Sequence, residues 1–184
     1  MEDRKLLKTF KNVLPFIFLI TSAVLSRILP HPPNFAPVAG LALFSGAYLS
    51  GFGSFAFPLI IMIFSDMILG FHSTLLYVYG SFLLIVFIGK LLREKKSFRL
   101  FVGASFISSL LFFLITNFGV WMSTNMYSKD LWGLFQAYVM GIPFFKNTIL
   151  GDLFYTLTLF YGFKFITLIS QRLLFSLPSQ KKSS

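Results

Sequence analysis

The sequence predicts an all-α membrane protein, with six transmembrane helices in one bundle and both termini in the cytoplasm. Two observations lead to this fold class. First, 56% of the 184 residues are hydrophobic and only 12% are charged, which is too apolar for a water-soluble domain of this length. Second, the apolar residues gather in runs of helical length, separated by breaker or charged residues. The runs cover residues 13–29, 38–51, 54–70, 74–92, 99–122 and 143–170.

The basic residues test this helix count independently, because lysine and arginine concentrate in cytoplasmic loops. With six spans assigned to the runs, thirteen of the 16 basic residues fall on one side and three on the other. This asymmetry places both termini in the cytoplasm, as an even number of spans requires. The first side holds Arg4, Lys5, Lys8, Lys11, Lys90, Arg93, Lys95, Lys96, Arg99, Lys164, Arg172, Lys181 and Lys182, and the other holds Arg27, Lys129 and Lys146.

We therefore divide the chain into a basic cytoplasmic N-terminus at 1–12, a transmembrane domain at 13–170 and a basic cytoplasmic tail at 171–184. The first run resembles a signal peptide, but no clear cleavage site precedes Arg27 and further spans follow it. A net charge of +10 would suggest a nucleic-acid partner for a soluble protein. Here the basic residues follow membrane topology and no nucleic-acid motif accompanies them, so we expect none. Without cysteine, disulfide and thiol chemistry are excluded.

The first run ends at Arg27 on the outer side, and the segment 30–37 that follows holds four prolines. Such a segment is stiff and extended. It could cap a pocket from outside with His31 and Asn34, or it could be a plain connector that starts the second helix at Pro37.

The second run is short for a hydrocarbon core about 30 Å thick. It either tilts little or starts inside the protein, where irregular backbone is tolerated. Ala42, Gly46 and Ser50 follow one another at four-residue spacing, which lets another helix approach closely. The pattern leaves open whether that helix belongs to this chain or to another subunit. Ser22 and Ser26 in the first run raise the same question.

The polar residues of the later runs nearly all fall in the outer half of the predicted membrane domain. A charge at the bilayer centre costs roughly 2.5–3.5 kcal/mol, so these residues need partners. Polar residues that serve only helix packing would spread through both leaflets, and one-sided clustering therefore favours a pocket open to the outside. The residues concerned are Asp66, His72, Thr116, Asn117, Trp121, Lys146, Asn147 and Asp152.

The last run begins with a polar stretch, residues 143–152. Pro143 suits the first turn of a helix. Lys146 in that turn would oppose the helix dipole, so an anionic ligand or a carboxylate would stabilise it. Alternatively, Lys146 extends to the lipid headgroups and Asp152 pairs with a neighbouring helix. At helical spacing Thr148 and Asp152 share one face of the last run, and Phe112 and Thr116 share one face of the fifth run. We expect both faces to point inward.

These considerations predict a substrate-binding site with no catalytic residue, no metal ligand and no cofactor. Basic side chains would meet carboxylate or phosphate groups, an indole would stack on a ring, and asparagines would recognise amide or hydroxyl edges. The predicted site comprises Arg27, His31, Asn34, Asp66, Asn117, Trp121, Lys146, Asn147 and Asp152.

Several motifs resemble those of a family of small bacterial inner-membrane proteins of unknown function. They are Arg27-x-x-Pro-His-Pro-Pro-Asn-Phe35, Ala42-Leu-Phe-x-Gly-Ala-Tyr48, Ser65-Asp66, Thr116-Asn-Phe118 and Pro143-Phe-Phe-x-Asn-Thr-x-x-Gly-Asp152. More distantly, the six-helix plan and the Pro-Phe-x-x-Asn motif resemble the substrate-binding S components of energy-coupling-factor vitamin transporters. This resemblance implies a subunit of the bacterial inner membrane that captures a vitamin-like solute and docks to a transmembrane T component with two cytoplasmic ATPases.

Carried over to this chain, the resemblance implies that Asn147 lines the pocket and that residues 31–35 form a lid. Ser22 and Ser26 stand where the family usually has two alanines for docking. Glu2 follows Met1, so the Met-His start of the metal-transporting members is absent and a metal substrate is not expected.

Two other functions remain open. In a structural or assembly subunit, the polar groups would serve helix contacts alone. In an intramembrane enzyme acting on a lipid-linked substrate, His31, His72, Asp66 and Asp152 would carry acid–base chemistry.

Overall fold

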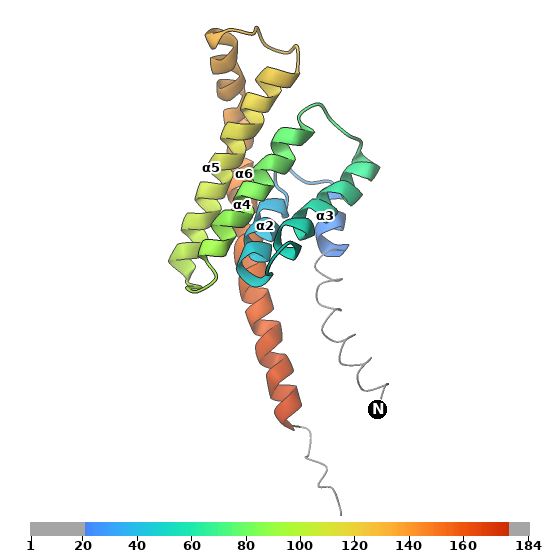
Figure 1. Cartoon of the computed structure of the whole chain (residues 1–184), viewed down its shortest axis with the longest axis vertical. Helices are drawn as coiled ribbons and strands as arrows, with labels where there is room; N and C mark the ends of the chain where they lie inside the picture. Colours follow the sequence, from blue (N-terminus) through green and yellow to red (C-terminus); the bar gives the residue numbers. More distant parts are fainter. Residues whose placement is uncertain (1–20, 177–184) are drawn as a thin grey trace, which may run out of the picture.

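The computed structural model describes residues 21–176, with side chains up to residue 169, and this part of the chain is helical throughout, without strands (Figure 1). Residues 21–28 are helical and precede α2 (Val38–Tyr48), α3 (Gly53–Leu69), α4 (Leu75–Leu91), α5 (Phe98–Ser123) and α6 (Leu131–Ser176). The predicted basic N-terminus at 1–12 lies outside the described residues. Of the predicted tail at 171–184, the part up to residue 176 continues α6.

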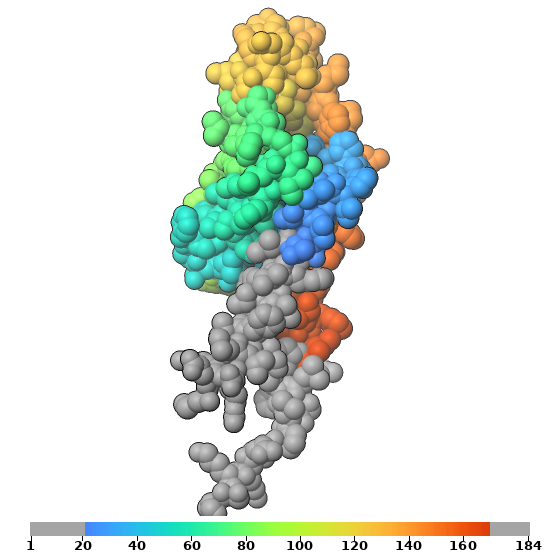
Figure 2. All heavy atoms as spheres, turned by 90° about the vertical axis from the view of Figure 1, so that its right-hand side faces the viewer, coloured from blue at the N-terminus to red at the C-terminus, as the bar shows by residue number. Residues whose placement is uncertain are grey.

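Successive connections alternate between the two ends of the molecule. Residues 49–52 and 92–97 lie toward the end where α6 finishes, and residues 70–74 and 124–130 lie toward the opposite end (Figure 1). The loop between α5 and α6 forms one extremity of the molecule (Figure 2). We call this extremity, residues 124–130, the hairpin tip. The connections at 70–74 and 124–130 therefore lie at one end of the bundle, and those at 49–52 and 92–97 lie at the other.

Helix α2 forms the centre of the fold. All of its residues except Tyr48 are buried, and it contacts α3, α4, α5 and α6. Phe44 packs edge-on against Phe160 of α6, with ring centroids 5.6 Å apart. An 11-residue helix spans only about 16 Å. Helix α2 therefore starts inside the protein, which is the second of the two options left open by its sequence.

Two glycines allow α2 and α4 to cross at backbone contact. A Cβ atom on Gly46 would overlap the carbonyl oxygen of Val86, and one on Gly89 would overlap that of Leu43. The small residue at position 46 thus serves packing within this chain. Beyond the crossing, Arg93 donates hydrogen bonds to the carbonyl oxygens of Gly46 (3.1 Å) and Leu49 (2.5 Å), which fixes the end of α2.

The prediction that the last helix begins at Pro143 is wrong, because α6 begins at Leu131 and contains Pro143 in its interior. The Asp130 carboxylate accepts a hydrogen bond from the backbone N–H of Gly133 (2.7 Å) and so caps the true start. A proline inside a helix removes one backbone hydrogen bond. Contacts with α5 before and after Pro143 support the helix there. Tyr138 donates to the carbonyl oxygen of Leu114 (3.0 Å), and the Phe113 and Phe145 rings lie 4.6 Å apart.

Within the described residues, two helices are long and apolar enough to cross a membrane. They are α5 and residues 131–169 of α6. Helices α2, α3 and α4 are apolar but shorter. Length and composition thus agree with a membrane protein.

Candidate functional site

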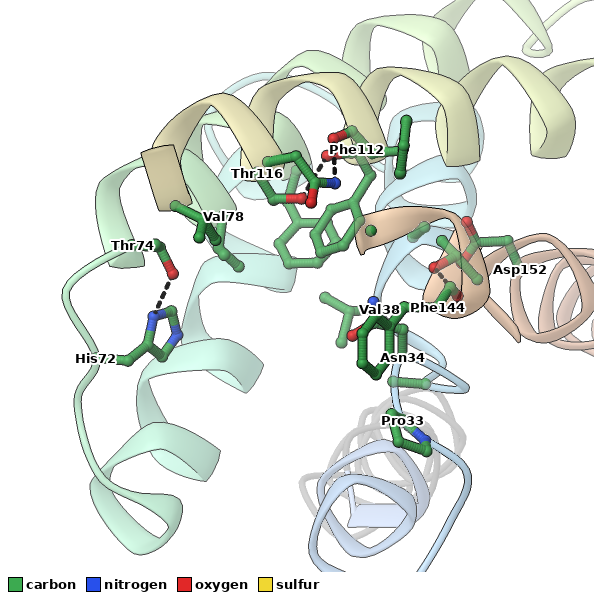
Figure 3. A pocket seen from close by; sticks show the side chains of 18 of the residues that line it. Pro33, Asn34, Val38, His72, Thr74, Val78, Phe112, Thr116, Phe144 and Asp152 are labelled. Atoms are coloured by element: carbon green, nitrogen blue, oxygen red, sulfur yellow. Dashed lines mark hydrogen bonds between the residues drawn. The ribbon is translucent and has the colours of Figure 1, made fainter. Parts of the chain in front are cut away.

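A cavity of about 600 Å³ lies between residues 30–37, which we call the proline-rich segment, and α4, α5, the hairpin tip and α6 (Figure 3). A volume of this size suits a small organic molecule. Phe82 and Phe112 form one aromatic wall, with stacked rings 5.3 Å apart. The polar lining consists of Arg27, His31, Asn34, His72, Thr74, Thr116, Asn117, Tyr127, Thr148 and Asp152.

Arg27 enters the cavity wall as one member of a buried ion pair. Its Nη2 atom lies 2.9 Å from Oδ1 of Asp66, and its Nη1 atom donates to the Ser65 hydroxyl at 2.8 Å. Tyr79 of α4 donates to Oδ2 of the same aspartate at 2.8 Å. The charge of Arg27 is thus neutralised within the protein, and Asp66, which is 1% exposed, is fully engaged behind the cavity wall.

Asp152 is buried between α5 and α6 and lines the same cavity. The Ser109 hydroxyl donates to its Oδ2 atom at 2.6 Å. One turn further along, the Ser105 hydroxyl donates to Thr156 at 3.0 Å, so a layer of hydroxyl groups joins the two helices here. No lysine, arginine or histidine of the described residues forms an ion pair with Asp152.

Asn117 and Gly141 face each other across α5 and α6. The Asn117 amide nitrogen donates to the carbonyl oxygen of Phe113 at 2.8 Å. A Cβ atom at position 141 would overlap the Asn117 side chain, so only glycine lets the amide lie so close to α6. The Oδ1 atom of Asn117 is directed at Gly141 of α6, and Asn117 is one of the residues that line the cavity.

The proline-rich segment turns back toward α6. Asn34 has φ 64°, a left-handed conformation that asparagine tolerates well. Beyond this turn the Phe35 ring packs against Phe154 (6.0 Å) and Tyr155 (5.6 Å) of α6. His31 is held by its Nδ1 atom, 2.9 Å from the carbonyl oxygen of Pro32. The segment therefore forms part of the cavity wall, with His31 and Asn34 in the lining.

Four of the residues proposed for the site lie outside the cavity lining. Asp66 lies behind Arg27. Trp121 donates its indole N–H to the carbonyl oxygen of Ser128 (2.8 Å) and so fastens the hairpin tip. Lys146 is exposed and Asn147 is partly exposed on α6. The structure thus brings Arg27, His31, Asn34, Asn117 and Asp152 together around one space.

The sequence analysis missed Tyr79 and the aromatic walls. In the sequence Tyr79 stands in an apolar run, so nothing marks it as a hydrogen-bond donor. Its contact with Asp66 becomes visible only when α3 and α4 are packed together. The hydrophobic residues Phe113 and Phe144 carry no local signal of a cavity either. Phe144, Thr148 and Asp152 do share one face of α6, and that spacing was the usable signal.

The charges of the hairpin tip are engaged outside the cavity. Lys129 donates to the carbonyl oxygens of Trp121, Met122 and Thr124 at the end of α5, which a cation stabilises. Hydrogen bonds, first from the Gly133 N–H and then from the Ser128 hydroxyl, lower the pKa of Asp130. Lys129 thus serves the end of α5, and Asp130 serves the start of α6.

Residues 7–174 match the sequence profile of a family described as "Family of unknown function (DUF6580)". No curated protein and no solved structure matches the chain.

Proposed function

The chain belongs to this DUF6580 family, and from the geometry of its cavity we propose that it is a membrane-embedded binding subunit for uptake of a small organic solute. The observation that carries the proposal is a cavity of about 600 Å³ with convergent polar groups inside an apolar helical bundle. The space is partly open to the outside, so a solute could enter it.

The lysines of α6 suggest how the bundle sits in the membrane. Lys146 and Lys164 are both exposed and lie 18 residues apart. At 1.5 Å per residue this is about 27 Å, close to the thickness of a hydrocarbon core. Lysine side chains at these two levels would reach the two headgroup layers. The N-terminal part of α6 and the hairpin tip would then stand at or beyond the outer headgroups.

In this position the cavity faces the outer side. Most of its lining comes from residues 27–39, the α3–α4 connection, the hairpin tip and the first half of α6, and the rest comes from α3, α4 and α5. The basic connection at 92–97 lies at the opposite end of the bundle, where the cytoplasm would be. The proline-rich segment, packed on α6 through Phe35, is placed to act as a lid.

We propose further that a partner couples capture to transport, as in the S components that the sequence resembles. Ser22 is exposed on the helical residues 21–28, whereas its neighbour Ala23 is buried. An exposed small residue permits a close helix approach. A transmembrane T component with cytoplasmic ATPases fits that role.

The test is to purify the full chain in an uncharged maltoside detergent, denature it and identify the released small molecules by mass spectrometry. Ala137 is 2% exposed and lines the cavity, whereas Val139 is 40% exposed on the other side of α6. We expect a retained molecule in the parent protein and in Val139→Phe, and its loss in Ala137→Phe.

A protein that releases nothing, and whose unfolding temperature no added solute changes, contradicts the proposal. If Ala137→Phe does not fold, Asn117→Ala supplies the second variant, because it removes a polar group from the wall without adding volume. The matching change Asn147→Ala lies outside the lining and is expected to retain the molecule.

A further inference from the structure

We propose that the solute is an organic cation, whose ammonium group binds at Asp152 and whose apolar part lies against the phenylalanines of the cavity. This inference rests on the proposed function and specifies its substrate class. It departs from the expectation that basic residues would bind a carboxylate or phosphate.

The charges of the cavity wall give the first argument. Arg27 is the one arginine or lysine of the described residues in the lining, and Asp66 already neutralises it. Lys146, the other cation expected at the site, is exposed outside the lining. An anionic solute would therefore have to compete with Asp66 for Arg27. The cavity offers no second fixed cation of the described residues to hold it.

The surroundings of Asp152 give the second argument. Its side chain is nine-tenths or more buried, since the residue is 3% exposed, and its only described hydrogen-bond partner is the neutral Ser109 hydroxyl. An isolated buried carboxylate is strongly unfavourable unless a cation or a proton neutralises it. Asp152 lines the cavity, so a solute in the cavity can supply that cation. The two histidines of the lining, His31 and His72, come from the proline-rich segment and the α3–α4 connection, whereas Asp152 lies on α6.

Aromatic side chains in the lining that Asp152 shares give the third argument. Phe112 lies one turn beyond Ser109 on α5, and Phe144 lies two turns before Asp152 on α6, and both line the cavity. Figure 3 shows Phe112, Phe144 and Asp152 around the same space. The face of an aromatic ring attracts an ammonium group, most strongly where water is excluded. A cavity that holds a buried carboxylate and phenylalanine rings in one lining is thus suited to an amine or a quaternary ammonium group.

The experiment compares three probes that share a phenyl ring on a short alkyl chain and differ in charge. They are 2-phenylethylamine, which is a cation at pH 7, 3-phenylpropanoate, which is an anion, and 3-phenylpropan-1-ol, which is neutral. Each is titrated against the purified full chain in maltoside detergent, and the unfolding temperature is recorded. Sodium chloride is titrated alone as a fourth probe. We expect the amine to bind about tenfold or more tightly than the other two organic probes.

Variants then locate the site. Asp152→Asn keeps the shape and an acceptor for Ser109 but removes the charge, and we expect it to weaken amine binding about tenfold or more. Asp152→Glu keeps the charge and should retain the preference for the amine. Asp130→Asn removes the same charge from the hairpin tip, outside the cavity, and should leave amine binding unchanged. The comparison of probes on the parent protein requires no variant to fold.

The outcomes separate this inference from the proposed function. If the protein binds the anion or the alcohol as well as the amine, or if it releases an anionic or neutral native molecule, the inference is wrong while solute binding stands. The inference is also wrong if sodium alone raises the unfolding temperature and the amine adds nothing, or if Asp152→Asn binds the amine unchanged. If nothing binds and nothing is released, the proposed function itself fails.

Discussion

Two buried carboxylates, Asp152 in the cavity lining and Asp66 behind it, are stabilised in different ways. Asp66 accepts hydrogen bonds from Arg27 and Tyr79 and has its counter-charge within the protein. Asp152 has a single hydroxyl donor and no cationic partner in the part of the chain that the structure describes. Burial is alike in the two cases, so burial alone does not identify a ligand-binding residue. The proposed role of Asp152 rests instead on its lack of a cationic partner among the described residues.

The largest effect expected from this contrast is the loss of the Arg27–Asp66 pair. Asp66→Asn leaves the Arg27 guanidinium, whose side chain is 14% exposed, without a counter-charge, which should lower the free energy of unfolding by about 3 kcal/mol, the low end for buried pairs. Denaturant titration of the detergent-purified protein measures it. Replacing the pair by apolar side chains, Arg27→Met with Asp66→Leu, should recover most of that loss. A cost of Asp66→Asn no larger than that of the exposed Asp130→Asn would contradict the role of the pair.

The next effect concerns the scaffold that holds both carboxylates, since α2 contacts both α3 and α6. Gly89→Ala forces a methyl group into the backbone of α2 and should lower the free energy of unfolding by about 1–3 kcal/mol. Gly103 of α5 has open space where its Cβ would lie. Gly103→Ala should therefore stabilise its helix by about 0.5–1 kcal/mol. Equal effects of the two changes in denaturant titration would show that the α2–α4 crossing is not tight.

A smaller effect is expected at Tyr79, the second donor to Asp66. Tyr79→Phe removes one hydrogen bond to a charged group and should lower the free energy of unfolding by about 1.5 kcal/mol. Solute binding should not change, because Tyr79 lies outside the cavity lining. Tyr161, which is 42% exposed, provides the control, and Tyr161→Phe should be neutral. A changed affinity for solute in Tyr79→Phe would place the Asp66 group inside the binding site.

The smallest effect on stability is expected at Asp152, although the carboxylate is as buried as Asp66. Asp152→Asn removes an isolated buried carboxyl group without breaking an ion pair, so the ligand-free protein should keep its free energy of unfolding or gain slightly. The stabilisation by bound amine, about 2.7 kcal/mol at a hundredfold excess over the dissociation constant, should largely disappear. Unfolding measured with and without 2-phenylethylamine tests both statements. A loss as large as that of Asp66→Asn, without ligand, would remove the distinction between the two carboxylates.

The helical runs at 38–51, 54–70, 74–92 and 99–122 could be read from the sequence, because each is bounded by prolines, glycines or charges. The start of α6 could not be placed in this way. Pro143 is a typical first-turn residue, yet α6 continues through it, and α5 contacts α6 on both sides of it through Tyr138 and Phe145. A local signal was overridden by tertiary contacts.

The site residues of α6 could be predicted from the 100° rotation per residue, which shows which side chains share one face of the helix. Thr148 and Asp152 share a face, and both line the cavity. Lys146 was grouped with them because it is close in the sequence. At 100° per residue, however, it lies on the far side of the helix from Phe144 and Thr148, and the structure leaves it exposed. Proximity along a helix was a poorer guide than phase.

The sequence by itself determined the apolar helical character of this protein and the clustering of its polar residues toward one end, since composition and spacing are local properties. Only the tertiary structure decided which charges meet. Arg27 and Asp66 are 39 residues apart and pair because the helical residues 21–28 pack beside α3, while the same packing leaves Asp152 facing a cavity with a neutral hydroxyl. Charge pairing depends on distances of a few ångströms between separate helices, and these distances are set by packing.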